Sequence, residues 1–362
     1  MVEIKEIARR VESWLNGRPR NPYKVDFFIT ERCNLKCRFC NFPLLNESRY
    51  KKELTRVEIL SVIDYCGEND VEIVGILGGE PFVRKNVLLE VMRRIKEYGM
   101  TGSIVSNGTL LDKEAIMNLV KIGWDLIRFS LDGMQATHDF LRNKRGTFKT
   151  LVNTIKKLNK AKKNLRTKKP TIEINTVLCN KNYNELPDII KLASSLSCNH
   201  VYILPMIEFT EYSRKLRILN EDLDEVKKYL WKAKEISTKL NLSTNINEII
   251  GQELITKSNR MDEIILPKEK VEDKNYIPCF LPWYTMNIDA VGNVMPCCNI
   301  SSLEENMRNK SLEKIWLGKE FDEMRKRMLE KNLSEECSRC CLPLTDENRN
   351  LRRIIGEKWK KK

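Results

Sequence analysis

The chain has 362 residues, of which 41% are hydrophobic, so it can bury a sizeable core and does not have the composition of a disordered protein. Lys and Arg exceed Asp and Glu by 14, which can indicate an anionic partner, although basic runs are usually solvated faces. No run of 18 apolar residues predicts a membrane span, and residues 1–20 lack a signal peptide's apolar core. Twelve cysteines in a chain of this length favour metal-binding thiolates in the cytoplasm over a secreted disulfide framework.

Apolar runs alternate with amphipathic helical patterns between residues 25 and 206, after an expected N-terminal helix within 1–22. The expected strands are 25–30, 71–77, 102–106, 126–131, 171–178 and 201–205. The helices expected between them are 55–66, 86–98, 112–121, 147–164 and 184–196. Thr55 and Glu58 form a capping box at the start of the first of these helices. Strands separated by helices predict an α/β fold with a parallel sheet, and six such units predict a partial (β/α)6 TIM-like barrel.

Polar or glycine-rich turns follow four of these strands. They are residues 33–40, 78–81, 106–109 and 130–133. Because the carboxyl ends of parallel strands share one edge of a sheet, we expect all four turns at the same rim, where active sites form in folds of this class.

The first turn contains three cysteines in CxxxCxxC spacing, Cys33, Cys37 and Cys40. Thiolates are soft ligands that favour iron–sulfur clusters or zinc. A four-iron cluster normally takes four cysteines, so three would leave one iron with an exchangeable site. The alternative is a zinc site completed by a distant ligand, but the two histidines, His138 and His200, do not have zinc-finger spacing.

Residues 28–40, including the aromatic Phe39 before the last cysteine, resemble the radical S-adenosylmethionine (SAM) superfamily. The resemblance implies that Cys33, Cys37 and Cys40 hold a catalytic [4Fe–4S] cluster whose open iron binds the amino and carboxyl groups of SAM. It also implies that an electron from this cluster cleaves SAM to a 5′-deoxyadenosyl radical, which abstracts a hydrogen from the substrate.

Three later turns are similar to the SAM-contacting motifs of that family. The GGEP turn at residues 78–81 resembles the motif that contacts the SAM amino group. The SNGT turn at residues 106–109 resembles the motif near the SAM carboxylate and ribose. The SLDG turn at residues 130–133 resembles the motif that approaches the SAM carboxylate. Each alone is as readily an ordinary turn. Further on, Arg142 could pair with a carboxylate, or could be a surface charge. The residues that the resemblance assigns to cofactor binding are Phe39, Gly78, Gly79, Glu80, Ser106, Asn107, Ser130, Asp132 and Arg142.

The expected core domain, 23–211, is followed by a helical connector over 212–275, with an amphipathic helix at 221–240. A small cysteine-rich module over 276–345 and a basic helical tail over 346–362 complete the chain. Within the module, residues 288–297 predict a β-hairpin.

The spacing of Cys279, Gly292 and Cys297 resembles the SPASM/Twitch auxiliary-cluster domains. A full SPASM domain uses seven cysteines, so the shorter Twitch form, with one auxiliary [4Fe–4S] cluster, is the closer match. Its implied ligands are Cys279, Cys297, Cys337 and Cys340. The adjacent Cys298 or Cys341 could replace a neighbour, and a zinc ribbon with four cysteine ligands is the alternative.

The resemblance implies a radical SAM oxidoreductase or maturase that acts on a peptide or a sugar or aminocyclitol substrate, with the auxiliary cluster assisting oxidation or modification. It also implies an external one-electron donor of the flavodoxin or ferredoxin type, and nothing indicates a membrane partner. One alternative is radical SAM modification of tRNA or a protein, with the positive charge steering the substrate. The other is a zinc-containing nucleic-acid-binding protein, against which the low aromatic content of 7% argues.

Overall fold

The computed structural model describes residues 2–45, 47–208, 210–251, 278–297, 303, 305–330, 332, 337 and 350–356. The chain divides into two compact units. The first comprises Met1–Phe28, Glu53–Gly75 and Arg260–Lys362, and the second comprises Ile29–Lys52 and Ile76–Asn259. Because the first unit is assembled from three separate stretches, it brings together parts of the chain that are distant in sequence. The domain limits expected from the sequence stay predictions.

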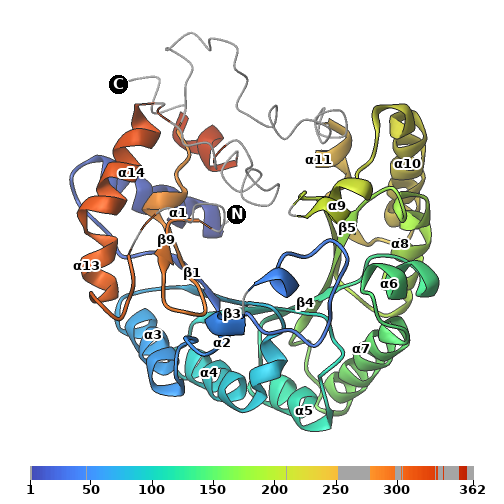
Figure 1. Ribbon diagram of the computed structural model, residues 1–362, viewed down its shortest axis with the longest axis horizontal. Helices are drawn as coiled ribbons and strands as arrows, with labels where there is room; N and C mark the ends of the chain where they lie inside the picture. The colour runs from blue at the N-terminus through green and yellow to red at the C-terminus, as the bar shows by residue number, and fades with distance from the viewer. Residues whose placement is uncertain are drawn as a thin grey trace. The chain divides into compact units, whose positions relative to one another are not determined.

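The second unit contains parallel strands in the order β7-β6-β5-β4-β3, with helices in the connections. The strands are β3 (Thr101–Ser106), β4 (Leu126–Ser130), β5 (Thr171–Leu178), β6 (His200–Pro205) and β7 (Ser243–Thr244). The α-helices are α2 (Glu47–Tyr50), α4 (Lys85–Glu97), α5 (Lys113–Lys121), α6 (Gln135–Leu141), α7 (Thr147–Asn164), α8 (Leu186–Ser195), α9 (Glu211–Lys215), α10 (Leu223–Lys239) and α11 (Ile246–Gly251). The 3-10 turns are η1 (Phe42–Leu44), η2 (Pro81–Arg84), η3 (Tyr183–Glu185) and η4 (Asn220–Asp222). Helices α4, α5, α7 and α8 lie outside the strands in Figure 1.

The strands of this unit have one apolar and one polar side. In β4 and β5 the residues Ile127, Phe129, Ile172 and Ile174 are fully buried. The residues between them are half-buried and include an ion pair of 2.8 Å between Arg128 and Glu173. The apolar side therefore forms the core, as expected for a parallel sheet whose helices cover one face.

The first unit contains a mixed group of strands. β1 (Lys24–Phe28) pairs in parallel with β8 (Thr285–Ile288), and β8 pairs in antiparallel with β9 (Val294–Met295). The β8–β9 pairing confirms the predicted hairpin, and Gly292 in its turn has a φ of 92°, in the region that favours glycine. β2 (Ile73–Leu77) lies across the division between the units. The remaining elements are α1 (Val2–Leu15), α3 (Arg56–Glu68), η6 (Leu281–Trp283), α13 (Leu312–Trp316) and α14 (Lys319–Leu329).

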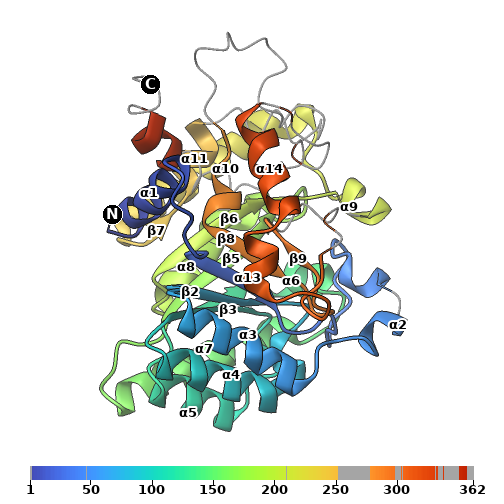
Figure 2. The same ribbon diagram turned by 90° about the vertical axis from the view of Figure 1, so that its left-hand side faces the viewer.

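The core of the first unit joins the two ends of the chain. Ile7 and Val11 of α1 pack in one buried cluster with Trp283 and Tyr284 and with Ile355 near the C-terminus. Both α1 and α14, drawn in blue and red in Figures 1 and 2, contact η6. The amphipathic helix predicted at the N-terminus is thus confirmed. No helix in the described part of the chain is long and apolar enough to cross a bilayer.

Candidate cofactor-binding site

The loop that carries the three N-terminal cysteines is tied to the GGEP turn through the backbone. The Gly79 amide donates to the Thr30 carbonyl at 2.9 Å, and the Glu80 amide donates to the Arg32 carbonyl at 2.9 Å. A Cβ atom on Gly79 would lie 2.6 Å from the Glu31 carbonyl oxygen, and Gly78 has a φ of 146°. Both glycines are therefore needed for the close approach of the two turns.

Glu80 is fully buried and is held by three hydrogen bonds. Its Oε1 accepts from the Ser106 hydroxyl at 2.9 Å and from the Phe82 amide at 3.2 Å, and its Oε2 accepts from the Asn107 amide at 2.7 Å. Burial raises the pKa of the Glu80 carboxyl to about 7, although these hydrogen bonds oppose the rise. The ionised form of a fixed, buried carboxylate of this kind is strongly stabilised by a cationic ligand such as an ammonium group.

Asn107 connects this carboxylate to the cysteine loop. Its side-chain Nδ2 donates to Oδ1 of Asn34 at 2.9 Å and lies 3.9 Å from Sγ of Cys33. The structure thus brings Cys33, Glu80, Ser106 and Asn107 together, although three different turns supply them. This agrees with the expectation that the turns share one rim.

The three thiols lie in a desolvated environment. Burial raises the pKa of Cys33 to about 11 and also raises the pKa of Cys40, and neighbouring thiols add to both shifts. The Leu35 amide donates to Cys33 Sγ at 3.4 Å. Among the described residues, no three His, Cys, Asp or Glu side chains meet at one point suited to a single metal ion. Three soft, mutually interacting thiols with hydrogen-bond donors at their sulfurs fit an iron–sulfur cluster, which spreads its ligands over several irons.

Arg142 is buried beside the same loop, so the interpretation of this residue as a surface charge is wrong. Its guanidinium pairs with the Asp132 carboxylate, donates to Cys37 Sγ at 3.7 Å and lies 5.5 Å from the centroid of the Phe39 ring. Arg142 follows the end of α6, whose His138 carbonyl accepts the Arg142 amide at 2.8 Å. A permanent positive charge therefore lies against one ligand of the predicted cluster.

Asp132 is held from three sides. Its Oδ1 accepts from the Val177 amide at 2.8 Å, and its carbonyl accepts from the Asn182 side chain at 3.0 Å. Its amide donates to Nδ1 of His138 at 3.2 Å. Burial lowers the pKa of His138 to about 3, so the imidazole is neutral and can accept this bond. Asp132 is thus a rigid anchor for Arg142.

Ser130 ends β4 in a polar row that the sequence interpretation missed. Ser130 lies beside Asn175 of β5, which lies beside Tyr202 of β6. The Oδ1 atom of Asn175 is buried and has no hydrogen-bond partner among the described residues. A polar residue alternating with buried apolar ones inside the expected strand 171–178 was the available signal for Asn175.

Three of the four predicted auxiliary-cluster cysteines lie in the described part of the first unit. Cys279, Cys297 and Cys337 all pack against the cluster that contains Trp283 and Tyr284. Cys340 lies outside the described residues, as do Cys298 and Cys341.

Two cysteines of the second unit outside the predicted site are buried thiols. Burial raises the pKa of Cys179 and of Cys198 to about 12. Both are therefore poor nucleophiles at neutral pH, which supports a packing role.

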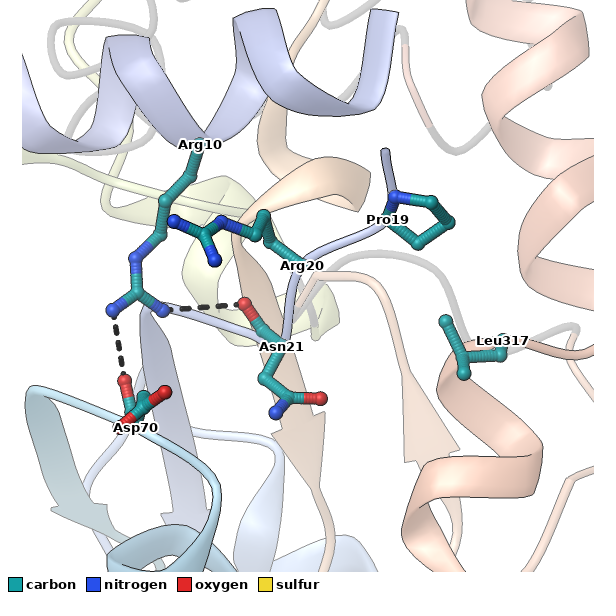
Figure 3. Close-up of a pocket in the computed structure, with 6 residues that line it drawn as sticks. All are labelled: Arg10, Pro19, Arg20, Asn21, Asp70 and Leu317. Carbon is teal, nitrogen blue, oxygen red and sulfur yellow. Dashed lines mark hydrogen bonds between the residues drawn. The ribbon is translucent and has the colours of Figure 1, made fainter. Parts of the chain in front are cut away.

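The first unit has a hollow of about 190 Å³ that none of the predicted site residues lines (Figure 3). In it, Arg10 donates to the carbonyls of Asn21 at 3.3 Å and Asp70 at 2.9 Å. This arginine joins α1 to the two loops that contain Asn21 and Asp70.

Comparison with protein families matches two parts of the chain. A model of the radical SAM superfamily matches residues 27–193, which include all predicted SAM-binding residues. A model of an iron–sulfur cluster-binding domain, SPASM, matches residues 279–341. The two matches thus correspond to the two cysteine clusters.

Individual relatives are distant. The AdoMet-dependent heme synthase of Methanosarcina barkeri is 24% identical over 330 residues, 88% of each chain. The PqqA peptide cyclase of Bradyrhizobium diazoefficiens is 26% identical over 312 residues, 83% of this chain and 74% of the relative. The chain aligns with only 30% and 51% of the length of two other curated relatives. A crystal structure of Streptococcus suis SuiB covers 88% of this chain and 71% of its own, with a TM-score of 0.65 and 18% identity, which supports the assigned fold.

Proposed function

Because the chain belongs to the radical SAM superfamily and carries a C-terminal iron–sulfur cluster-binding domain, we propose that it abstracts a hydrogen atom from a peptide and that one auxiliary [4Fe–4S] cluster assists the oxidation or modification that follows. The observation that carries this proposal is the buried Glu80 carboxylate, hydrogen-bonded to Ser106 and Asn107 beside Cys33. The bound [4Fe–4S] cluster and SAM supply one-electron cleavage of the sulfonium and hydrogen abstraction.

In this proposal, Cys33, Cys37 and Cys40 would hold the [4Fe–4S] cluster, whose open coordination site would be available to SAM. Glu80 accepts the SAM ammonium group. Because Ser106 and Asn107 already fix both oxygens of the carboxylate, little reorganisation accompanies binding. An adjacent ammonium also favours the ionised form and so offsets the effect of burial on the Glu80 pKa.

Arg142 has two tasks in the same proposal. Its positive charge stabilises the Cys37 thiolate, and its ring contact orients Phe39 at the edge of the site. Asp132 positions Arg142 and keeps its guanidinium from turning toward the ligand. Ser130, Asn175 and Tyr202 then offer hydroxyl and amide groups to SAM or to the substrate.

A peptide substrate is supported by the similarity to PqqA peptide cyclase, which extends over 83% of the chain. A second candidate is a tetrapyrrole, because the similarity to the AdoMet-dependent heme synthase covers 88% of both chains. The net charge of +14 suits the carboxylates of such a substrate. The sugar, aminocyclitol and tRNA possibilities stay predictions. We place the reaction in the cytoplasm, which agrees with the unusual number of cysteines. The electron would come from an external one-electron donor of the flavodoxin or ferredoxin type.

The test is anaerobic reconstitution followed by SAM cleavage with dithionite as reductant. We expect 5′-deoxyadenosine from the wild-type protein, and deuterium transfer into it from a deuterated peptide substrate. Deuterium transfer from a deuterated porphyrinogen carboxylate instead would favour the tetrapyrrole candidate. Zinc without iron, and no 5′-deoxyadenosine, would contradict the whole proposal.

A further inference from the structure

The outer side of the cysteine loop is joined to the end of α6. The Arg38 amide donates to the Leu141 carbonyl at 2.9 Å, and Arg38 Nε donates to the Phe140 carbonyl at 2.9 Å. The Arg38 guanidinium lies 4.4 Å from the centroid of the Phe140 ring. Any molecule that covers Phe140 therefore touches the segment between two predicted cluster ligands, Cys37 and Cys40.

The side chain of Phe140 is 40% exposed, one of seven large apolar side chains with at least this exposure among the described residues. Basic side chains surround this part of the chain, since Lys144 and Arg145 are exposed in the turn after α6, and Lys36 is exposed in the cysteine loop. Protein–protein interfaces commonly have an aromatic anchor near the centre and charged or polar side chains at the rim. We call Lys36, Arg38, Phe140, Lys144 and Arg145 the donor face.

Few acids lie close in sequence to the basic residues of the donor face. The Arg38 guanidinium also lies 5.3 Å from the centroid of the Tyr212 ring, and the acid next to Tyr212, Glu211, is paired with Lys215. The sequence from residue 144 to residue 169 contains no Asp or Glu. The nearest acid before it, Asp139, is half-buried and caps α7, where it accepts from the Gly146 amide at 2.6 Å and the Phe148 amide at 2.8 Å. The two exposed cations of this turn therefore outnumber its one carboxylate, and this excess of positive charge attracts an acidic surface.

We propose that the donor face is the docking site of an acidic one-electron carrier protein. This inference rests on the proposed function, because reductive SAM cleavage consumes one electron per event. The carrier gives up one electron and is oxidised by one equivalent, and the [4Fe–4S] cluster accepts that electron. An acidic carrier fits better than a substrate does, because the face borders the outside of the ligand loop and the electron must arrive at that loop.

Purified acidic flavodoxin is the probe, and its dissociation constant is measured by titration calorimetry at low and physiological ionic strength. We expect the pair Lys144→Glu with Arg145→Glu to raise the dissociation constant about tenfold and to weaken its salt dependence. The control pair is Lys160→Glu with Lys163→Glu, exposed toward the far end of α7, about 20 Å from Arg145. Because both pairs change the net charge equally, the control should shift the constant less than about threefold.

Two further measurements separate docking from folding and from catalysis. Phe140→Ser should raise the dissociation constant but leave its salt dependence unchanged, because it removes apolar contact and no charge. In stopped-flow experiments, cluster reduction by reduced flavodoxin should slow in the Lys144→Glu, Arg145→Glu protein, while dithionite-driven SAM cleavage stays at the wild-type rate.

Equal weakening by the two charge pairs would overturn the inference, as would no weakening by either. If the Lys144→Glu, Arg145→Glu protein lost binding to an anionic peptide or RNA oligonucleotide but still bound flavodoxin, the donor face would belong to another partner. That result would also overturn the inference. Failure of the wild-type protein to cleave SAM with dithionite would instead count against the proposed function, and the binding results do not depend on it.

Discussion

Arg142 donates a hydrogen bond to Cys37 Sγ at 3.7 Å while its guanidinium is paired with Asp132 inside the second unit. Both charged side chains are almost completely buried. The ion pair therefore holds a positive charge against one predicted cluster ligand at a fixed position, where solvent screens it little.

Replacing Arg142 by Gln should destabilise the apoprotein by about 3–5 kcal/mol, because it leaves the Asp132 carboxylate buried without its partner. Adding Asp132→Asn should recover most of this loss. The measurement is urea unfolding of the single and double variants under anaerobic conditions. Equal stability of the two would contradict the expected recovery, and the Asp132→Asn single variant completes the cycle that measures the coupling of the pair.

In the reconstituted double variant, the reduction potential of the N-terminal cluster should become more negative than in the wild type. The reason is that a cation beside the thiolates favours the reduced state, which carries the extra electron. Potentiometric titration followed by electron paramagnetic resonance measures this, and an unchanged potential would mean that Arg142 serves only packing.

Replacing Cys33, Cys37 and Cys40 together by Ala should lower the iron content from about eight to about four per chain and abolish 5′-deoxyadenosine formation. Cys198→Ala is the matched control, because Cys198 is a buried thiol of the same unit outside the predicted ligand set. Its iron content should stay at about eight. Retained SAM cleavage in the triple variant would contradict the ligand assignment.

Glu80 should make the apoprotein less stable as the pH rises from about 4.5 to about 7. Burial raises the Glu80 pKa to about 7 in the folded state, so the unfolded chain loses its proton first and stability falls across this window. Glu80→Gln should remove a slope of at most about 1.4 kcal/mol per pH unit. Unfolding midpoints of both apoproteins across this range test the prediction, and parallel curves would refute it.

His138 should act in the opposite direction at acid pH. Burial lowers its pKa to about 3, so below pH 6.5 the unfolded chain takes up the proton that the folded state refuses, and stability falls as the pH drops toward 3. His138→Gln keeps a hydrogen-bond acceptor for the Asp132 amide without titrating. Its stability should be less sensitive to acid than that of the wild type, as measured by thermal unfolding in buffers from pH 6.5 downward.

Gly79→Ala should disrupt the contact between the GGEP turn and the cysteine loop. The new Cβ would approach backbone carbonyls of Glu31 and Arg32 that cannot move aside independently. Gly99→Ala is the control, because Gly99 has a φ of 75° but nothing lies within 4 Å of its Cβ position. The control should cost about 1 kcal/mol, and Gly79→Ala should cost more and also weaken SAM binding.

Local sequence patterns were sufficient to predict most helices and strands of the second unit. The expected strand at 171–178 coincides with β5, and the helix at 147–164 coincides with α7. In the first unit, the predicted Thr55 capping box is also present, and the Glu58 side chain accepts from the Thr55 amide at 2.7 Å. These features depend on residues a few positions apart, and such residues carry the periodic and capping signals.

Long-range pairings were not predictable in the same way. Nothing local to residues 285–288 indicates that β8 pairs in parallel with β1, and nothing near α1 indicates that it shares a core with Ile355. At the site, the sequence placed Glu80 and Asn107 on one rim but left open whether Arg142 was buried. Its burial depends on Asp132, Val177 and His138, which come from the turn after β4, from β5 and from α6.

The pairing of β1 with β8 also bears on the order of events during synthesis. Lys24 pairs with Thr285, so the strand that leads into the cysteine loop gains this neighbour only when most of the chain has left the ribosome. Contacts between such distant segments form slowly, because a long loop must close first. We therefore expect the edge of β1 that pairs with β8 to stay unpaired until late in translation. Iron delivered after release from the ribosome would therefore reach a cysteine loop whose preceding strand, β1, is already paired with β8. Iron delivered earlier would reach the loop before β1 has this partner.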